Sequence, residues 1–368
     1  MTHAPARHRI ALVMIARNEA PRIARALASV RDHVDAMVVL DTGSTDDTAA
    51  CARAVGAQVA SFTWCDDFSA ARNAALALAD ADWHLVLDAD EWLADGGAVL
   101  DALRTRTPDF VGSLRVDSQF DAAGGVAVAP SWLPRLLPRD VRYTGRIHEQ
   151  PAHRLPVRRL AVTLGHEGYR RTALAAKAGR NARLLQAALV DAPHDPYLHY
   201  QLGKDHDVYA RYAAAVACFA QSRACEAAPA DAAAARPPRP PAWHHDRLVR
   251  ELHALKQCRR HAEAVQLADD AMGLWEASPD YWFTLGDLLL DWAADEPDRG
   301  GELLPMIEAA WKRCLAIGER PDLEGAVAGR GGALALHNLA VLYDGTGRPA
   351  KARKMRERIA AARTPVTE

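Results

Sequence analysis

The chain of 368 residues lacks the features that mark several large classes of protein. Its 45 Lys and Arg against 47 Asp and Glu give a formal net charge of −2, without the basic excess of a dedicated nucleic-acid binder or the acidic excess of a disordered protein. No apolar run reaches about 18 residues, so no transmembrane helix is predicted. The six cysteines form no Cys-x-x-Cys pair, so neither a zinc knuckle nor a thioredoxin-like site is expected.

Two nucleotide-binding signatures are also missing. No Gly-x-Gly-x-x-Gly follows the first apolar run and no Gly-x-x-x-x-Gly-Lys-[Ser/Thr] occurs, which removes the dinucleotide fingerprint and the P-loop. Scattered cysteines in a chain of this size fit a reducing compartment, so we expect a cytoplasmic protein. The length favours two domains.

The first 95 residues alternate strand and helix patterns. Short apolar runs predict strands at 10–16, 36–40, 59–62 and 83–87, and helical spacing predicts helices at 19–30, 45–55 and 68–79. Such alternation is typical of a parallel α/β sheet. Residues 96–168 are less regular, and short strand candidates at 112–116 and 126–129 are expected to finish the sheet.

From about residue 170 the sequence predicts helices, with Ala, Leu and charged residues at intervals of three to four. Gly203 with Phe219, Trp282 with Gly286, and the segment 338–352 follow tetratricopeptide spacing. We therefore predict an α/β domain at 1–168 and an all-α tetratricopeptide-like domain at 169–368, with a flexible loop at 227–241. An irregular helical bundle is the alternative.

Carboxylates follow the fourth predicted strand directly, in the segment Asp88-Ala89-Asp90-Glu91. In α/β sheets, ligands bind at the carboxyl ends of parallel strands. The hard oxygens of Asp88 and Asp90 suit Mg²⁺ or Mn²⁺, ions that usually share their coordination with substrate phosphates. Taken alone, a pair of this kind is also typical of an acidic turn or a helix cap.

Two further segments begin predicted helices. Asp41 ends the second strand, where its carboxylate can accept hydrogen bonds from a base or ribose, and Gly43 permits a tight turn before free helix amides. The segment 64–73, Trp-Cys-Asp-Asp-Phe-Ser-Ala-Ala-Arg-Asn, presents Arg72 to a diphosphate. A capped turn and an ion-paired helix start are the structural alternatives.

In this order, and with Met14-Ile15-Ala16-Arg17-Asn18-Glu19, these motifs resemble the nucleotide-sugar domain of family 2 glycosyltransferases, which has the GT-A fold. The resemblance runs through residues 10–93. The similar branch joins this domain to tetratricopeptide-like helices, and the segments 134–137, 147–150 and 166–169 look like its downstream motifs.

The resemblance implies a metal-dependent, inverting hexosyltransferase that uses a nucleoside diphosphate sugar. By analogy with the family, we take the nucleotide to be UDP. Asn18, Glu19 and Asp41 would hold the nucleoside. Asp88 would lie near the ribose and the metal, and Asp90 would bind the Mn²⁺ or Mg²⁺ that bridges the diphosphate.

The remaining roles are assigned from chemistry. Arg72 helps neutralise the leaving diphosphate. Glu149 is the predicted general base, because the acceptor needs a base within hydrogen-bond reach and a metal-bound carboxylate is a poor one. His148 or His166 completes the metal shell, since imidazole tolerates Mn²⁺; a structural role is the alternative for each.

The acceptor stays open between a protein, a lipid and a polysaccharide, and the helical domain is a candidate surface for a protein partner. Seven arginines against Asp140 and Glu149 lie in 130–160, which favours an anionic acceptor or a peripheral position at the inner membrane surface. No nucleic-acid partner is expected. Two other classes compete: a binding scaffold with an inactive transferase domain, and a nucleotidyltransferase, which would need a Gly-rich basic loop after the first strand.

Overall fold

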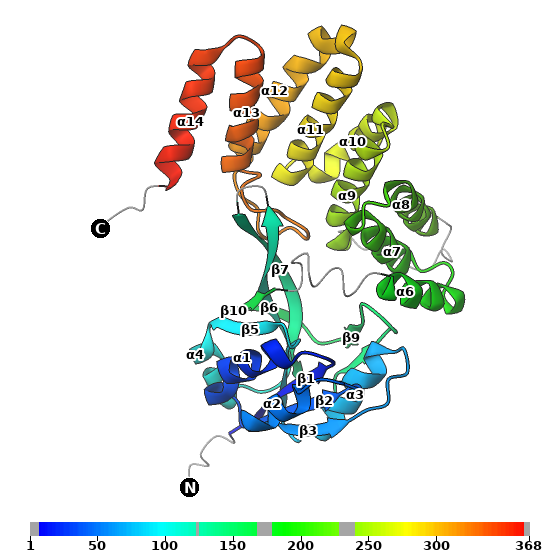
Figure 1. Ribbon diagram of the computed structural model, residues 1–368, viewed down its shortest axis with the longest axis vertical. Helices are drawn as coiled ribbons and strands as arrows, with labels where there is room; N and C mark the ends of the chain where they lie inside the picture. The colour runs from blue at the N-terminus through cyan, green and yellow to red at the C-terminus, as the bar shows by residue number, and fades with distance from the viewer. Residues whose placement is uncertain (1–6, 123–124, 168–178, 228–239, 364–368) are drawn as a thin grey trace. The chain divides into compact units, whose positions relative to one another are not determined.

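The structure, a computed structural model, describes residues 7–122, 125–167, 179–227 and 240–363 (Figure 1). The chain divides into two compact units, Met1–Asp191 and Ala192–Glu368. The sequence analysis put the boundary at residue 168, so helix α6 (Arg180–Asp191) is the difference between the two divisions. Arg183 in α6 donates to both carboxylate oxygens of Asp66 at 2.9 Å, which ties this helix to the first unit. Residues 228–239 of the predicted loop lie outside the described residues.

The first unit is built on an eight-stranded sheet of order β3-β2-β1-β4-β7-β6-β10-β5. Its strands are β1 (Ile10–Ala16), β2 (Ala36–Asp41), β3 (Gln58–Ser61), β4 (Trp83–Val86), β5 (Glu91–Asp95), β6 (Val111–Ala122), β7 (Gly125–Pro138) and β10 (Val157–His166), and a separate small sheet pairs β8 (Arg142–Thr144) with β9 (Gln150–Ala152). Strands β3, β2, β1 and β4 run parallel, as predicted. Strands β7 and β5 run antiparallel to their neighbours, so the sheet is mixed but mostly parallel.

Helices cover both faces of this sheet because β1 is apolar along its whole length and buried on each face. The helical segments are α1 (Ala20–Val30), η1 (Arg31–His33), α2 (Thr48–Ala54), α3 (Phe68–Leu78), α4 (Gly97–Ala102) and η2 (Leu103–Thr105). Ile23, Ala26, Leu27 and Val30 form the buried stripe of α1 and pack with Leu12 of β1 in one core layer. The other face carries a second apolar layer that includes residues of α3.

The predicted strands at 112–116 and 126–129 both belong to the sheet, as expected, but each strand is much longer than predicted. Strands β6 and β7 form one long antiparallel hairpin, with pairing from Gly112 opposite Leu136 to Ala122 opposite Gly125. The prolines of this segment argue against a long strand when the sequence is considered alone. Proline cannot donate a hydrogen bond to a neighbouring strand, so within sheets it is confined to edges without such a bond. Strand β4 pairs only with residues 136–138 of β7, so Pro130 and Pro134 lie where β7 has β6 as its single partner.

The second unit consists of helices that follow one another as hairpins (Figure 1). They are α7 (Pro196–Val208), α8 (Tyr212–Ala227), α9 (Trp243–Gln257), α10 (His261–Trp275), α11 (Pro279–Asp295), η3 (Pro297–Arg299), α12 (Gly300–Ile317), α13 (Ala333–Gly345) and α14 (Pro349–Arg363). A Cβ atom on Gly203 would lie 2.5 Å from the Phe219 ring, and one on Gly286 would lie 2.4 Å from Trp311. The same close approach therefore recurs in two hairpins, which agrees with the predicted tetratricopeptide-like spacing.

In the part of the chain that the structure describes, no helix has both the length and the apolar character needed to cross a bilayer.

Candidate active site

The predicted donor residues gather at one edge of the sheet. Strands β2, β1 and β4 are parallel neighbours, so their carboxyl ends lie side by side. Asp41 ends β2, Asn18 and Glu19 follow β1, and Asp88 follows β4. This edge is where α/β sheets bind ligands.

Hydrogen bonds join the loop after β1 to the loop after β2. Asn18 adopts a left-handed conformation (φ 56°), its amide N–H donates to Ser44 Oγ at 3.0 Å, and its Oδ1 accepts from the Thr45 amide at 2.8 Å. The Glu19 amide donates to Thr48 Oγ1 at 2.7 Å. The side chain of Asn18 therefore shapes the site by fixing both loops.

Asp41 has one oxygen engaged and one available. Oδ1 accepts from the amides of Gly43 (3.0 Å) and Ser44 (2.8 Å), which closes the turn after β2. Gly43 takes φ 101°, a conformation that glycine adopts without strain. Among the described residues, Oδ2 accepts no hydrogen bond, so this oxygen can meet a ligand.

Asp88 is held between two arginines. Arg72, near the start of α3, donates from Nη2 to Oδ1 at 2.8 Å, and Arg135 on β7 donates from Nη2 to Oδ2 at 2.8 Å. Burial raises the pKa of Asp88, but the two guanidinium groups lower it by more than burial raises it. The net pKa of Asp88 therefore lies well below its usual range. The carboxylate of Asp88 is thus ionised and fixed in orientation.

Arg135 and Glu91 complete this cluster. Arg135 Nη2 also donates to Glu91 Oε1 at 2.5 Å, and Glu91 Oε2 accepts from the Asp88 amide at 3.0 Å. Glu91 is 2% exposed, and burial raises its pKa. Arg135 was not among the predicted site residues, although an arginine beside apolar residues signals that its charge needs a buried partner.

Arg72 links Asp88 to the predicted base. Its Nε donates to Oε1 of Glu149, which lies between β8 and β9 and has only 10% of its side chain exposed. Coulombic attraction to Asp88 and Glu149 outweighs burial and raises the pKa of Arg72 well above its ordinary value. The structure therefore brings Arg72, Asp88 and Glu149 together.

The four predicted metal ligands do not form one cluster. Asp90 and His166 lie side by side, with His166 Nε2 3.6 Å from Asp90 Oδ2. Asp88 is instead engaged by arginines, and His148 lies beside Glu149, where its carbonyl accepts from Gln150 Nε2 at 3.2 Å. Within the described residues, no three His, Cys, Asp or Glu side chains are grouped so as to hold a metal ion.

A second histidine contact was not predicted. The Oγ atom of Ser118, on β6, lies 2.9 Å from Nδ1 of His166. No local sequence pattern indicates this contact, because the two residues are 48 positions apart. Only the pairing of β6 with β10 brings them into register.

A small hollow of about 70 Å³ borders Asp90 on the side of α1. Arg25 lines it, lies 3.5 Å above the Trp92 ring, and donates to Glu167 at 2.9 Å. Arg22 lines it as well and donates to Glu19 at 2.7 Å. Asp90 therefore faces a pocket that carries two arginines.

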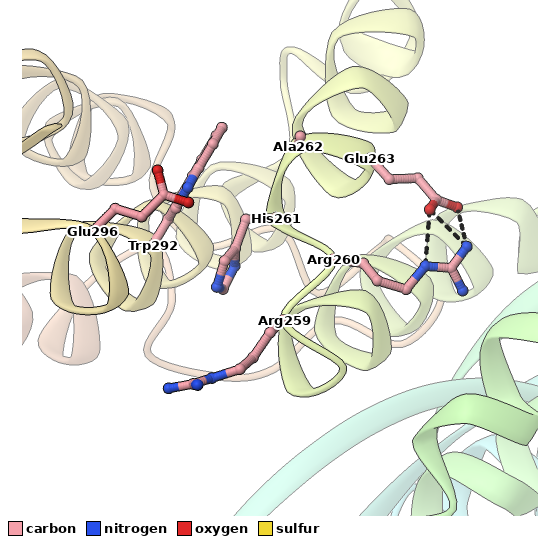
Figure 2. Close-up of a pocket in the computed structure, with 7 residues that line it drawn as sticks. All are labelled: Arg259, Arg260, His261, Ala262, Glu263, Trp292 and Glu296. Atoms are coloured by element: carbon pink, nitrogen blue, oxygen red, sulfur yellow. Dashed lines mark hydrogen bonds and ion pairs between the residues drawn. The ribbon is translucent and has the colours of Figure 1, made fainter.

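A larger hollow of about 330 Å³ lies in the helical unit, between the start of α10 and the end of α11 (Figure 2). Its charged side chains pair among neighbours: Arg260 donates to Glu263 at 2.8 Å, and His261 Nε2 lies 2.8 Å from Asp295. None of the motifs singled out in the sequence contributes to it, so the candidate active site lies in the first unit.

Comparison with known proteins agrees with this placement. The family model described as Glycosyl transferase family 2 matches residues 11–122. A TPR repeat-containing protein of Synechococcus elongatus is 40% identical over 217 residues, 53% of this chain and 51% of that protein. An uncharacterized glycosyltransferase of Rickettsia felis is 43% identical over 86 residues, 23% of this chain and 30% of that protein.

The SPbeta prophage-derived glycosyltransferase SunS of Bacillus subtilis is 27% identical over 201 residues, 52% of this chain and 48% of that protein. The chain thus spans about half the length, or less, of these three relatives. The matched residues 11–122 contain β1 to β4, the strand-end carboxylates and Arg72. Residues 11–122 therefore match glycosyltransferase family 2, in a mostly parallel α/β unit that is followed by a tetratricopeptide-like helical region.

Proposed function

We propose that the first unit is a metal-dependent, inverting glycosyltransferase that moves a hexosyl group from a nucleoside diphosphate sugar, UDP-linked by default, to a hydroxyl of an acceptor. One observation carries the proposal. Three adjacent parallel strands deliver Asp41, the Asn18–Glu19 loop and the Asp88–Asp90 segment to the same edge of the sheet. The family 2 match over residues 11–122 supports the donor class.

The donor's nucleoside lies, in this proposal, over the ends of β1 and β2. Oδ2 of Asp41 accepts from the base or ribose, since Oδ1 is already used by the turn. Asn18 and Glu19 hold the two loops in place. Asp88, whose orientation is fixed by two arginines, accepts from a ribose hydroxyl without having to reorganise on binding.

The residues at Asp90 fit a hard divalent cation. A carboxylate oxygen and an imidazole nitrogen lie side by side there, a donor pair that accepts Mn²⁺ and also Mg²⁺. Ions of this kind usually complete their coordination with water and substrate phosphate oxygens. When bound, the ion neutralises negative charge on the leaving diphosphate. We favour His166 over His148 as the imidazole ligand, because the His166 ring lies 3.6 Å from the Asp90 carboxylate.

Transfer is then one in-line displacement. The acceptor oxygen forms a bond to the anomeric carbon as the bond from that carbon to the diphosphate oxygen breaks, and the electron pair leaves with the diphosphate. The acceptor proton goes to Glu149, the proposed base. The guanidinium group of Arg72 donates to both Asp88 and Glu149, so it links the proposed base to the carboxylate that follows β4.

The acceptor and the setting are proposed more broadly. A protein, a lipid or a polysaccharide hydroxyl is the acceptor, and the helical unit is a docking surface for a protein partner. We place the protein in the cytoplasm, at the inner membrane surface if its acceptor is there, because the segment 130–160 carries seven arginines.

A thermal-shift screen tests the proposal. UDP-, GDP- and dTDP-linked sugars are added to the full chain with and without Mn²⁺, and a donor that binds the native state raises its Tm. We expect one nucleotide class to raise Tm more in the presence of Mn²⁺, and slow release of the nucleoside diphosphate from that donor. If no donor raises Tm and none is hydrolysed, the first unit is an inactive domain on a binding scaffold.

A further inference from the structure

Three neighbouring strands set a row of polar side chains beside the proposed metal site. In the parallel pairing of β10 with β6, His166 lies opposite Ser118. In the antiparallel pairing of β10 with β5, His166 lies opposite Glu91, the residue that follows Asp90. Backbone pairing on both sides therefore fixes where His166 sits between Ser118 and Asp90, independently of any loop.

Ser118 is a buried polar residue whose hydroxyl has a specific partner. It is 7% exposed, and its Oγ lies 2.9 Å from His166 Nδ1. A hydroxyl removed from water costs free energy unless a hydrogen bond replaces the lost ones, so this contact explains why a serine is tolerated there. Because Nδ1 is engaged by Ser118, the ring presents Nε2 to Asp90.

We propose that Ser118 is a positioning residue that orients His166 so that its Nε2 lone pair faces the cation held with Asp90. The inference rests on the metal assignment of the proposed function. A histidine that binds metal through one nitrogen donates the proton on the other to a neighbour, which fixes both the tautomer and the ring plane. In this proposal Nδ1–H donates to Ser118 Oγ, 2.9 Å away, and Nε2 is then the unprotonated nitrogen that binds the ion.

Ser113 offers a matched control on the same strand. It lies on β6, is 6% exposed, and makes no side-chain hydrogen bond to any described residue. Its partner across β7 is Pro134, far from His166 in the register. Removing its hydroxyl therefore changes the same chemical group at a similar depth on the same strand, without removing a hydrogen bond to His166.

The test measures binding of Mn²⁺ alone to the full chain, by titration calorimetry and by the EPR signal of free Mn²⁺. Loss of an outer partner of a metal-bound histidine typically weakens metal affinity by about 10–100-fold, so we expect that loss for Ser118→Ala. We expect wild-type affinity for Ser113→Ala. Electron spin echo spectroscopy of bound Mn²⁺ should show an imidazole nitrogen in the wild type and a weakened nitrogen signal in Ser118→Ala.

A second pair keeps the test valid if Ser118→Ala does not fold. Ser118→Thr and Ser118→Val have nearly the same shape and differ in the hydroxyl, and β-branched residues suit a strand. We expect Thr to retain Mn²⁺ affinity and Val to lose it, with thermal unfolding of the metal-free variants as the check on folding.

The outcomes separate the inference from its premise. If wild-type protein binds Mn²⁺ through an imidazole and the Ala and Val variants bind it equally well, Ser118 has no positioning role. Equal losses in Ser118→Ala and Ser113→Ala mean a general packing effect and also overturn it. If the wild type binds no Mn²⁺, or binds it without an imidazole signal, the metal assignment itself is wrong and the inference is wrong with it.

Discussion

Each unit of the molecule buries a cluster of charged side chains, and the two clusters differ in what surrounds them. In the helical unit, Asp246 is 2% exposed and accepts from Tyr200 Oη at 2.6 Å and Arg250 Nε at 2.9 Å, with Lys204 Nζ at 3.3 Å. Burial raises its pKa, but Arg250 and Lys204 lower it by more, and the net pKa lies below the usual range. This cluster lies among helices α7 and α9 and joins them.

In the first unit, the cluster around Asp88 lies at the ends of strands and not between helices. Arg72 comes from a helix and Arg135 from a strand, and both donate to Asp88, while Glu149, in a loop, accepts from Arg72. The difference teaches that burial and ion pairing alone do not identify a functional charge. Position at the carboxyl edge of parallel strands does, because that edge is open to ligands. Substitutions in the first unit should therefore change transfer, and those in the second should change stability.

The largest effect is expected at Asp90. Asp90→Ala removes the carboxylate that the proposed cation needs, while the sheet that carries it is held by apolar packing. We expect donor turnover to fall by at least about 100-fold, the usual cost of losing charge stabilisation at a leaving group. Release of nucleoside diphosphate with Mn²⁺ present measures this, and an unchanged Tm without metal shows that the fold is intact. Full turnover in this variant would contradict the metal assignment.

Glu149→Gln should separate binding from transfer. The amide keeps the shape and can still accept a hydrogen bond from Arg72, but it cannot take the acceptor proton. Loss of a general base usually costs about 10²–10⁴-fold, so kcat should fall by that range while the donor-induced Tm rise persists. If the variant no longer binds donor, Glu149 belongs to the donor site and another residue is the base.

Asp246→Ala tests the other side of the comparison. It leaves Lys204 without the contact at 3.3 Å and Arg250 with Asp207 alone, and breaking a buried pair costs about 3–5 kcal/mol. We expect urea unfolding followed by circular dichroism to shift by about the lower end of that range, since Asp207 remains. Donor binding by the first unit should stay at the wild-type level; a loss of donor affinity would mean that the two clusters are not functionally separate.

An effect that appears only at higher pH is expected at Glu251 of α9. Its side chain is 1% exposed, and burial raises its pKa to about 7, although Arg223 lies 3.0 Å away. The folded state holds the proton more tightly than the unfolded state, so stability is fully present below about pH 4.5 and declines as pH rises to about 7. The shift corresponds to about 3 kcal/mol at pH above 7.

Glu251→Gln should remove that decline, because the amide does not ionise. The variant should unfold at higher urea concentration than the wild type at about pH 8 and at the same concentration near pH 4. A wild-type pH profile in the variant would mean that another group titrates. Turnover at a given pH should be the same in both proteins.

Local sequence patterns predicted part of the fold well, for a physical reason. Strands β1 and β4 are continuous apolar runs, and such runs end where their burial ends, so their bounds were predicted to within about one residue. The partners at the site could not be found in this way. Arg72 and Glu149 are 77 residues apart and Asp88 and Arg135 are 47 apart. The pairing of β4 with β7 brings Asp88 near Arg135, and the packing of α3 beside β8 brings Arg72 near Glu149.

Proline in β7 also reduces the number of N–H groups that its edge can offer to another chain. An exposed strand with unpaired N–H and C=O groups is a template on which a strand of another molecule can add, the first step of aggregation. Pro130 and Pro134 carry no N–H, and they lie where β7 pairs with β6 and, among the described residues, with no other strand. Pro134 is partly exposed, so this edge of β7 has one donor fewer to offer a second chain, and replacing Pro134 with a residue that carries an N–H should make the protein more prone to self-association.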